Sequence, residues 1–274
     1  MRPFAVKGHA QRSDHPDMSE PLAPGAQLRP GYRVVAHLSR NAALDVYDLF
    51  SVERDCRCIG KVVRGDRTDD RARVRLVREG EILLSLTHPH IVRAYALLDA
   101  DADPALVLET LTGETVSHML ASDGPLGYAD LAELGRQLCS ALGYLHRRGW
   151  VHLDLKPDNV IAQGGIAKVL DLSLARPPGP VNPGIGTRGW LAPEQAAGAV
   201  AGPPADVWGA GAVLYAAATG GDRPDGPRRS LAALPRGLRG AITACLEHDP
   251  GLRPSVAELA AALAPFTGDL AAAA

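Results

Sequence analysis

A nine-residue stretch near the middle of the chain, VHLDLKPDN at residues 151–159, constrains the fold more than any other feature. It brings a histidine, two aspartates, a lysine and an asparagine into close succession. The preceding segment, 130–149, has leucines at helical spacing and ends in Gly149, the residue expected at a helix C-cap. Two interpretations are open: a catalytic loop, or a polar turn between a helix and a strand.

The composition limits the classes of protein to consider. A chain of 274 residues, 46% of them hydrophobic, can form one large domain or two small lobes. The net charge of -2 gives no electrostatic reason to expect nucleic-acid binding. The longest apolar run, 208–218, predicts a buried helix and is shorter than the ~20 residues of a membrane span. With no signal-peptide pattern and cysteines that we expect to be reduced, the sequence favours a cytoplasmic protein without a membrane span.

Hydropathy patterns divide the chain into two parts. Residues 1–29 contain several prolines and little periodicity, so we expect a flexible leader. Residues 30–110 predict a β-rich lobe, residues 111–265 a larger and mostly helical lobe, and residues 266–274 a flexible tail. In the first lobe the patterns predict one helix, 69–86, and five strands, namely 32–38, 44–52, 56–64, 90–98 and 104–110.

Seven short motifs follow one another along the chain. They are Lys61 in CIGKVV, Glu79 in LVREGEILL, HLDLKPDN at 152–159, Asp171 in KVLDLSLA, Ala192-Pro193-Glu194 in GTRGWLAPEQ, Asp206 in ADVWGAGAVLY and Arg253 in HDPGLRPS. From about residue 31 to 264 their order resembles that of the eukaryotic-type serine/threonine protein kinases, in particular the bacterial Hanks-type branch. The resemblance implies an α+β, bilobal, protein-kinase-like fold, with a small β-rich N-lobe carrying one helix and a larger, mostly helical C-lobe.

The resemblance gives each polar residue of the loop a role in phosphoryl transfer from ATP to a protein hydroxyl. Asp154 would be the catalytic base, and Lys156 would neutralise charge on the moving phosphoryl group. Thr187 would lie near Asp154. Asn159 and Asp171 would hold Mg²⁺ through side-chain oxygens.

The same resemblance implies an ATP site between the lobes. Lys61 would position phosphates and would pair with Glu79, because a lysine among apolar neighbours needs a counter-charge. Around the adenine ring, the resemblance implies Leu108 as gatekeeper, hydrogen bonds to the backbone of Glu109 and Leu111, and apolar contacts from Leu38, Val46 and Ile161.

Other family residues are expected to act as scaffold. Glu194 and Arg253 would form a buried pair, and Asp206 would fix the backbone of the catalytic loop.

The phosphate-binding loop departs from the family pattern. Where that pattern has three glycines, this chain has Ser39, Asn41 and Leu44, which cannot fold as closely over phosphates. Ile59 replaces a common alanine of the adenine pocket, and Ser173 replaces the glycine of the Asp-Phe-Gly motif. These changes leave open a pseudokinase, that is, a nucleotide-binding or scaffold module. A small-molecule phosphotransferase is a third alternative, but it gives no reason to keep Ala192-Pro193-Glu194 with Arg253.

The activation segment departs as well. Leu153 stands where many kinases carry an arginine that pairs with a phosphorylated activation loop, and residues 174–186 contain no Ser, Thr or Tyr. We therefore expect that loop phosphorylation is not the switch, and that four prolines pre-order the segment.

The Gly-, Pro- and Arg-rich stretch at 220–240 predicts a solvated loop, with recruitment of an acidic partner as the alternative. Nothing in the sequence identifies the protein substrate, the activating signal or the oligomeric state.

Overall fold

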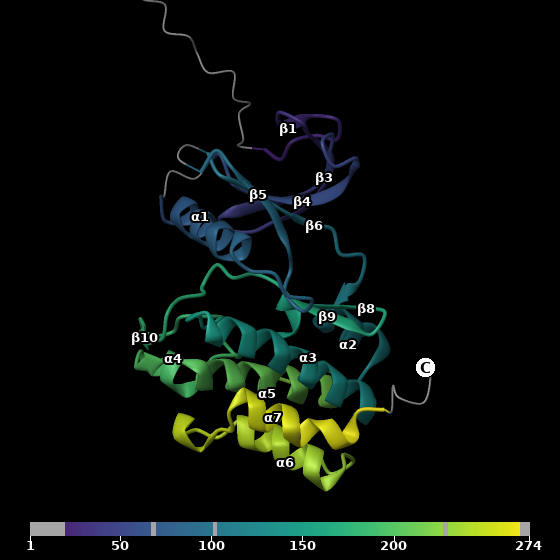
Figure 1. The fold of residues 1–274 in the computed structure, drawn as a ribbon, viewed down its shortest axis with the longest axis vertical. Helices are drawn as coiled ribbons and strands as arrows, with labels where there is room; N and C mark the ends of the chain where they lie inside the picture. The colour runs from purple at the N-terminus through teal and green to yellow at the C-terminus, as the bar shows by residue number, and fades with distance from the viewer. Residues whose placement is uncertain (1–19, 67–69, 101–102, 227–229, 269–274) are drawn as a thin grey trace, which may run out of the picture.

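The computed structural model describes residues 20–66, 70–100, 103–226 and 230–268. These residues form two lobes, a β-rich N-lobe above a helical C-lobe, connected by the chain between β6 and β7 (Figure 1). The predicted bilobal α+β fold is confirmed. The first 19 residues of the predicted leader and residues 269–274 of the predicted tail lie outside the described residues.

The N-lobe sheet is antiparallel, with six strands in the order β1-β2-β3-β4-β6-β5. The prediction of five strands missed β1, which is too short to show an alternating pattern. β1 pairs with β2 and buries Leu28, so residues 27–29 belong to the N-lobe and not to a flexible leader. The strands are β1 (Gln27–Arg29), β2 (Tyr32–Arg40), β3 (Leu44–Ser51), β4 (Cys56–Val63), β5 (Ala94–Leu98) and β6 (Ala105–Glu109).

The two faces of the sheet differ because side chains alternate along each strand. One face carries an apolar core whose fully buried members include Tyr47, Leu49, Cys58 and Val62. On each strand, the residues next in sequence to these core residues point to the other face of the sheet. There the register sets Val46 opposite Lys61, and Ile59 opposite Leu108.

Helix α1 (Asp70–Leu84) is the single helix among the described residues of the N-lobe, as predicted, and packs beside β4, β5 and β6. Its buried residues Leu76, Ile82 and Leu83 belong to the core that continues into the C-lobe. A Cβ atom on Gly80 would lie 2.9 Å from Leu97 Cδ1 of β5. The helix therefore approaches the sheet closely at Gly80, the neighbour of Glu79.

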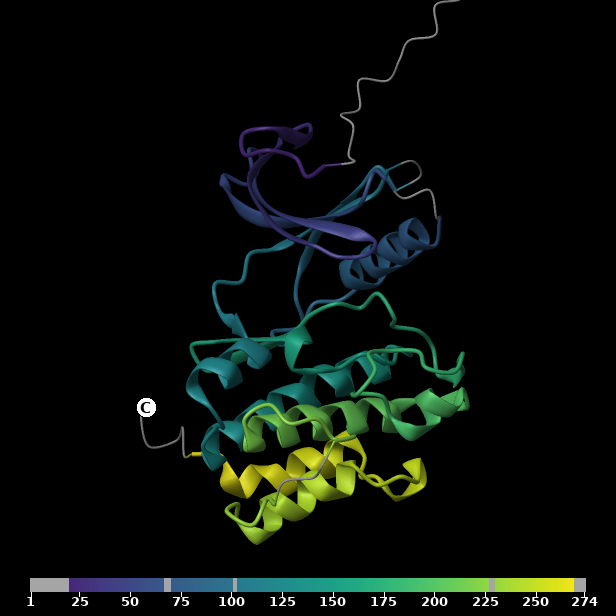
Figure 2. The same cartoon turned by 180° about the vertical axis from the view of Figure 1, so that it is seen from behind.

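The C-lobe is built around α5, which is buried along most of its length and packs against α3 and α6 (Figure 2). The predicted buried helix at 208–218 is confirmed as part of it. The helices are α2 (Val116–Asp123), α3 (Tyr128–Arg147), α4 (Pro193–Ala197), α5 (Pro203–Thr219), α6 (Arg236–Cys245) and α7 (Val256–Leu263), with short 3₁₀ turns η1 (Pro157–Asn159), η2 (Pro250–Leu252) and η3 (Ala264–Phe266).

Two small sheets complete the C-lobe. One consists of β7 (Glu114–Thr115), β8 (Val160–Gln163) and β9 (Ile166–Val169) and lies against the N-lobe (Figure 1). The other pairs β10 (Gly179–Pro180) with β11 (Val200–Ala201).

Two local predictions are wrong. The stretch 220–240 is not a solvated loop throughout: α6 begins at Arg236 and buries Leu238, Ala241 and Ile242 against α5, a contact that sequence composition cannot reveal. The predicted strand 90–98 begins only at Ala94, since Ile91 forms an isolated bridge to Val169.

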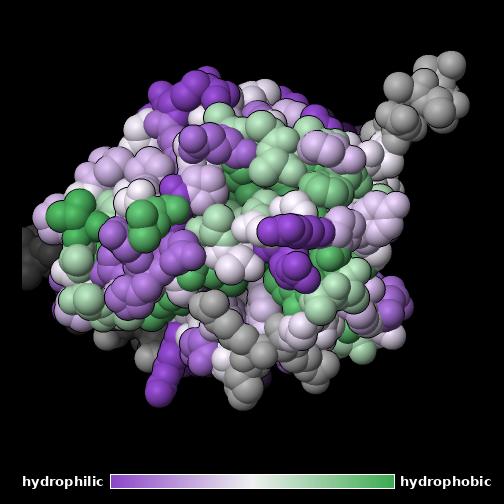
Figure 3. Space-filling view, turned by 90° about the horizontal axis from the view of Figure 1, so that it is seen from below, coloured by the Kyte–Doolittle hydropathy of each residue, from purple (hydrophilic) through white to green (hydrophobic). Residues whose placement is uncertain are grey.

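The lower face of the C-lobe mixes hydrophobic and hydrophilic side chains (Figure 3). Over the parts of the chain that the structure describes, no helix combines the length and apolar character that a membrane span requires.

Candidate active site

The backbone of the 151–159 loop is fixed by a buried carboxylate from α5. Asp206, 1% exposed, accepts the backbone N–H groups of His152 and Leu153, each at 2.8 Å, and contacts His146 Nε2 at 2.8 Å. Leu153 adopts φ = 65°, a conformation that costs free energy for a residue with a Cβ. The Asp206 carboxylate stabilises this strained turn, which confirms the role expected for it.

The acceptor end of the site unites four predicted residues. Lys156 Nζ donates to Thr187 Oγ1 at 2.6 Å and lies 3.6 Å from Asp154 Oδ2. Asn159 Nδ2 donates to the backbone oxygen of Asp154 at 2.8 Å and to its Oδ2 at 3.3 Å. The remaining oxygen, Asp154 Oδ1, is buried and has no hydrogen-bond partner among the described residues. An acceptor hydroxyl is the kind of group that would satisfy it.

Asp171 forms the other end of the same site. The Leu170 N–H donates to the Asn159 carbonyl at 2.8 Å, which places Asp171 beside the catalytic loop. Asp171 has φ = 58°, and its Oδ1 accepts the Ser173 N–H at 3.2 Å. Burial would raise the pKa of the Asp171 carboxyl, but Lys61 and Ser173 outweigh burial and lower it. The carboxylate is therefore ionised near neutral pH.

Lys61 and Glu79 form the predicted ion pair, with Nζ and Oε1 2.7 Å apart, and Lys61 Nζ lies 3.8 Å from Asp171 Oδ1. Glu79 is fully buried. Burial alone would lower the pKa of the Lys61 ammonium, but the two carboxylates outweigh it and raise the pKa. Lys61 thus stays charged at the mouth of the site, where it can face an anionic ligand.

The residues predicted around the adenine ring come from four segments. Val46 and Ile161 are half-buried, Leu38 is 53% exposed, and Leu108 is 5% exposed. Leu111 follows β6 and packs at the edge of the main core. Their contacts with a nucleotide stay predictions, as does crowding by Ile59.

The hinge between the lobes is braced through Glu109. Its Oε1 accepts the backbone N–H of Arg93 at 2.8 Å and also contacts Lys168 Nζ of β9. The Glu109 N–H donates to the Arg93 carbonyl at 2.9 Å. These bonds hold the end of β6 in place.

A closed hairpin occupies the position of the phosphate-binding loop. Asn41 Oδ1 accepts the N–H groups of Ala43 and Leu44, both at 2.8 Å, and the Asn41 N–H donates to the Leu44 carbonyl at 3.0 Å. Arg64 Nη1 donates to the Asn41 carbonyl at 2.9 Å. Three backbone amides at the position of the glycine-rich loop are therefore bound within the hairpin and are not available to phosphates.

Asp45 locks the base of the hairpin. Its buried carboxylate accepts two hydrogen bonds from Arg40, at 2.7 and 2.8 Å, and lies 2.9 Å from His37 Nε2. Burial would raise the pKa of this carboxyl, but Arg40 and His37 outweigh burial and lower it. The sequence singled out neither Arg40 nor Asp45.

The activation segment is anchored by backbone pairs along its length. Val151 and Arg176 exchange two hydrogen bonds, at 2.8 and 3.1 Å, and β10 pairs with β11. Near its end, Glu194 forms the predicted pair with Arg253, at 2.7 and 2.8 Å. The segment is thus held at its start, middle and end by contacts within the chain.

Gln195 is a contact residue that sequence reasoning missed, although it directly follows the Ala-Pro-Glu motif. It is 3% exposed, and its Nε2 donates to the carbonyls of Leu153, at 2.8 Å, and Ile185, at 3.0 Å. Its backbone carbonyl accepts the Gly184 N–H at 2.8 Å. A Cβ on Gly186 would lie 2.9 Å from the Leu153 oxygen, so glycine permits this close junction. Gln195 joins the catalytic loop to the activation segment.

Comparison with known proteins agrees with this geometry. The protein kinase domain family matches residues 32–262. A probable serine/threonine-protein kinase, PkwA of Thermomonospora curvata, is 33% identical over 277 aligned positions that cover 92% of this chain and 36% of PkwA. The serine/threonine-protein kinase PkaA of Streptomyces coelicolor is 35% identical over 69% of this chain and 39% of its own length. PrkC of Bacillus subtilis is 28% identical over 85% of this chain and 37% of its own length.

The fold and the site define a protein kinase domain. The chain belongs to the Hanks-type serine/threonine protein kinase family. It spans well under half the length of these curated relatives.

We expect Asp45→Asn to reduce the free energy of unfolding at pH 7 by about 2 kcal/mol, because it leaves Arg40 without its buried partner. The folded-state pKa of Asp45 lies below its unfolded value. Its stabilisation is therefore present above pH ~4 and is lost as the pH falls through the folded pKa. Urea titrations at pH 7 and pH 3 should show that the difference in free energy of unfolding between wild type and Asp45→Asn is smaller at pH 3. The exposed Glu53→Gln control should stay within about 0.5 kcal/mol of wild type; an equal deficit at both pH values would contradict the assignment.

We expect Gln195→Glu to reduce kcat/KM for a peptide substrate about tenfold or more, because a carboxylate would face the carbonyl oxygens of Leu153 and Ile185. Steady-state kinetics and nucleotide binding measure the effect, with ATP affinity expected to stay within about twofold. The exposed Gln27→Glu is the control for charge. A parallel loss of ATP affinity would instead indicate general unfolding of the site.

Proposed function

We propose that the chain transfers the γ-phosphoryl group of ATP to a serine or threonine hydroxyl of a protein substrate, with Mg²⁺. The observation that carries the proposal is the buried, unpartnered Asp154 Oδ1 beside Lys156 and Asn159. Family membership implies the use of ATP. The donor set fits a divalent cation, because the Asp171 carboxylate and the Asn159 amide oxygen are the hard ligands that Mg²⁺ prefers.

In this mechanism the side chains of the site have different tasks. Asp154 orients the acceptor hydroxyl and takes its proton at the free Oδ1, while the Asn159 amide holds the other oxygen in place. Lys156, held by Thr187, places its ammonium beside the acceptor and stabilises negative charge developing there. Lys61, kept charged by Glu79 and Asp171, attracts the phosphates. ATP with Mg²⁺, when bound, supplies the transferable phosphoryl group and neutralises charge upon it.

We also propose that activity does not depend on phosphorylation of the activation segment. The pair between Val151 and Arg176, the β10–β11 pair and the Gln195 hydrogen bonds hold the segment without a phosphate. Leu153 is 3% exposed and occupies an apolar environment where a phosphate-binding arginine would otherwise stand. This arrangement supports a kinase that is assembled without loop phosphorylation.

The four cysteines are free, and burial raises the pKa of three of them, Cys58 to about 11 and Cys139 and Cys245 to about 12. Unreactive thiols of this kind, together with ATP as the substrate, support the proposal of a cytoplasmic protein.

The proposal predicts transfer from labelled ATP to a generic protein substrate, with Asp154→Ala reducing kcat by about 10²-fold or more because the base is removed. Asp158, exposed in the same loop, provides the matched control: Asp158→Asn should stay within about twofold of wild type. Removal of Mg²⁺ by chelation should abolish transfer. Nucleotide binding by wild type without any transfer would instead support the pseudokinase alternative, and equal transfer by Asp154→Ala would contradict the assigned base.

Phosphatase treatment should leave kcat within about twofold of the untreated enzyme, because no contact that holds the segment uses a phosphate. Mass spectrometry of residues 172–186 before and after treatment verifies the modification state, with Ser173 as the single hydroxyl in that range. Activity that requires a phosphate at Ser173 would refute phosphorylation-independent assembly.

A further inference from the structure

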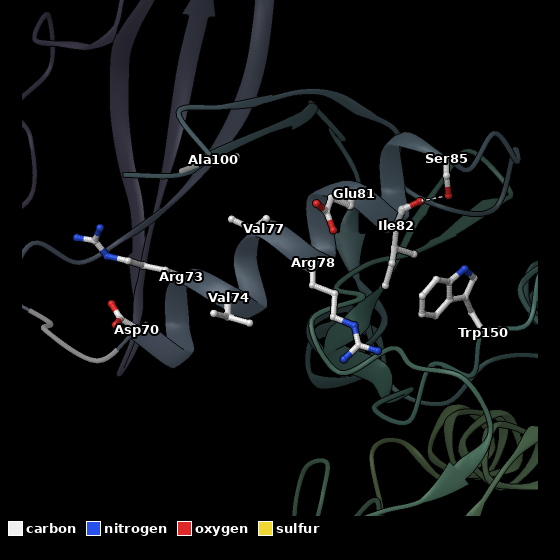
Figure 4. Close-up of a pocket in the computed structure, with 10 residues that line it drawn as sticks. All are labelled: Asp70, Arg73, Val74, Val77, Arg78, Glu81, Ile82, Ser85, Ala100 and Trp150. Carbon is white, nitrogen blue, oxygen red and sulfur yellow. Dashed lines mark hydrogen bonds between the residues drawn. The ribbon is translucent and has the colours of Figure 1, made fainter. Parts of the chain in front are cut away.

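A cavity of about 390 Å³ lies between the hairpin, α1 and the Asp171 end of the site, where the phosphates of ATP are expected. The hairpin contributes Asn41 and Leu44 to its lining, α1 contributes Arg75 and Glu79, and Asp171 and Ser173 close it from the C-lobe side. The cavity is thus bounded by the same residues that hold Lys61 and by the predicted metal ligand Asp171. It is distinct from the groove on the outer side of α1, which Arg73, Val74 and Trp150 line (Figure 4).

Helix geometry places Arg75 on the side of α1 that faces this cavity. Arg75 precedes Glu79 by four residues, and positions four apart lie on one face of a helix, about one turn from each other. Glu79 contacts Lys61 from this face. The Arg75 side chain therefore emerges next to the Lys61–Glu79 pair, whereas Arg73 points to the outer side, as Figure 4 shows.

Three backbone amides of the hairpin are not available to a phosphate group. The N–H groups of Asn41, Ala43 and Leu44 already donate within the hairpin, and Asp45 with Arg40 holds that arrangement closed. A triphosphate bound beneath the hairpin must therefore find hydrogen-bond donors other than these three amides. Lys61 is one such donor, because it contacts Glu79 and Asp171 of the cavity lining.

Arg75 is a second donor, on the helix side. Its side chain is exposed, and none of the carboxylates in the described residues forms an ion pair with it. Two further cations lie nearby: burial lowers the pKa of the Arg176 guanidinium, and the charges of Arg78 and Arg75 lower it further. A cation that lines a cavity without a counter-charge is suited to bind an anion.

We infer that Arg75 binds the terminal phosphate of the nucleotide from the helix side of this cavity and so replaces the amides of the missing glycines. The inference rests on the proposed use of ATP. The planar guanidinium can donate two parallel hydrogen bonds to phosphate oxygens. The phosphate would then lie between Arg75 on α1 and Lys61 on β4, with the hairpin as a rigid roof that makes no backbone contact with it.

Calorimetric titration of the folded chain with ATP and with ADP, both in the presence of Mg²⁺, tests this assignment. Arg75→Met should weaken ATP binding about tenfold or more, as expected for loss of a charge-assisted pair, while ADP binding changes by less than about twofold. Arg75→Lys keeps the positive charge but lacks the planar guanidinium. Its affinity for ATP should lie between those of wild type and Arg75→Met. Arg73→Met, on the outer side of the same helix, should bind both nucleotides as wild type does.

An unchanged ATP affinity in Arg75→Met, or an equal loss for ATP and ADP, would overturn the inference while leaving the proposed kinase activity standing. If wild type binds neither nucleotide, the proposed use of ATP fails first and this role of Arg75 fails with it. Because Arg75 is exposed, thermal unfolding of Arg75→Met should match wild type. The affinities can then be compared between equally folded proteins.

Discussion

The hydrogen bonds from the catalytic loop to the Asp206 carboxylate are the constraint on which the site depends. A carboxylate with 1% exposure inside an apolar helix is costly, and the N–H groups of His152 and Leu153 satisfy it. These hydrogen bonds hold Leu153 at a positive φ, and this turn directs Asp154 towards Lys156 and Asn159. The strained turn, the orphan oxygen of Asp154 and the contact to Thr187 all follow from this buried anchor.

The hairpin of the N-lobe differs from a glycine-rich loop in the way its backbone is held. Flexible glycines would fold over phosphates and bind them through backbone amides. Here the side chains of Asn41 and Asp45 accept hydrogen bonds from within the hairpin and hold it closed. Lys61 and Glu79 form an ion pair beside this hairpin, and Arg75, which forms no ion pair with the described residues, lies one helical turn from Glu79.

The activation segment is held by contacts within the chain. A phosphorylated loop is ordered by charge added after synthesis, whereas this segment is ordered by backbone pairing and by the amide of Gln195. The proline content suggested a pre-ordered segment, and the structure supplies the contacts responsible. These contacts connect the substrate side of the cleft directly to the Leu153 carbonyl.

Much of the site was predictable from sequence because its residues recur at fixed intervals within local motifs. The loop at 152–159, Asp171, Lys61 and the order of the lobes are all readable without coordinates, and the pairs Lys61–Glu79 and Glu194–Arg253 followed from family resemblance. Strand β1, helix α6 and the roles of Gln195, Arg40 and Asp45 were not predictable, because each depends on a partner that folding brings near. β1 is defined only by pairing with β2, and α6 only by packing on α5.

The sequence by itself thus determined which chemical groups are present and in what order. The tertiary structure alone decided which buried groups find partners and which, such as Asp154 Oδ1, have none among the described residues. The physical reason is that a hydrogen bond depends on distances that linear order does not encode.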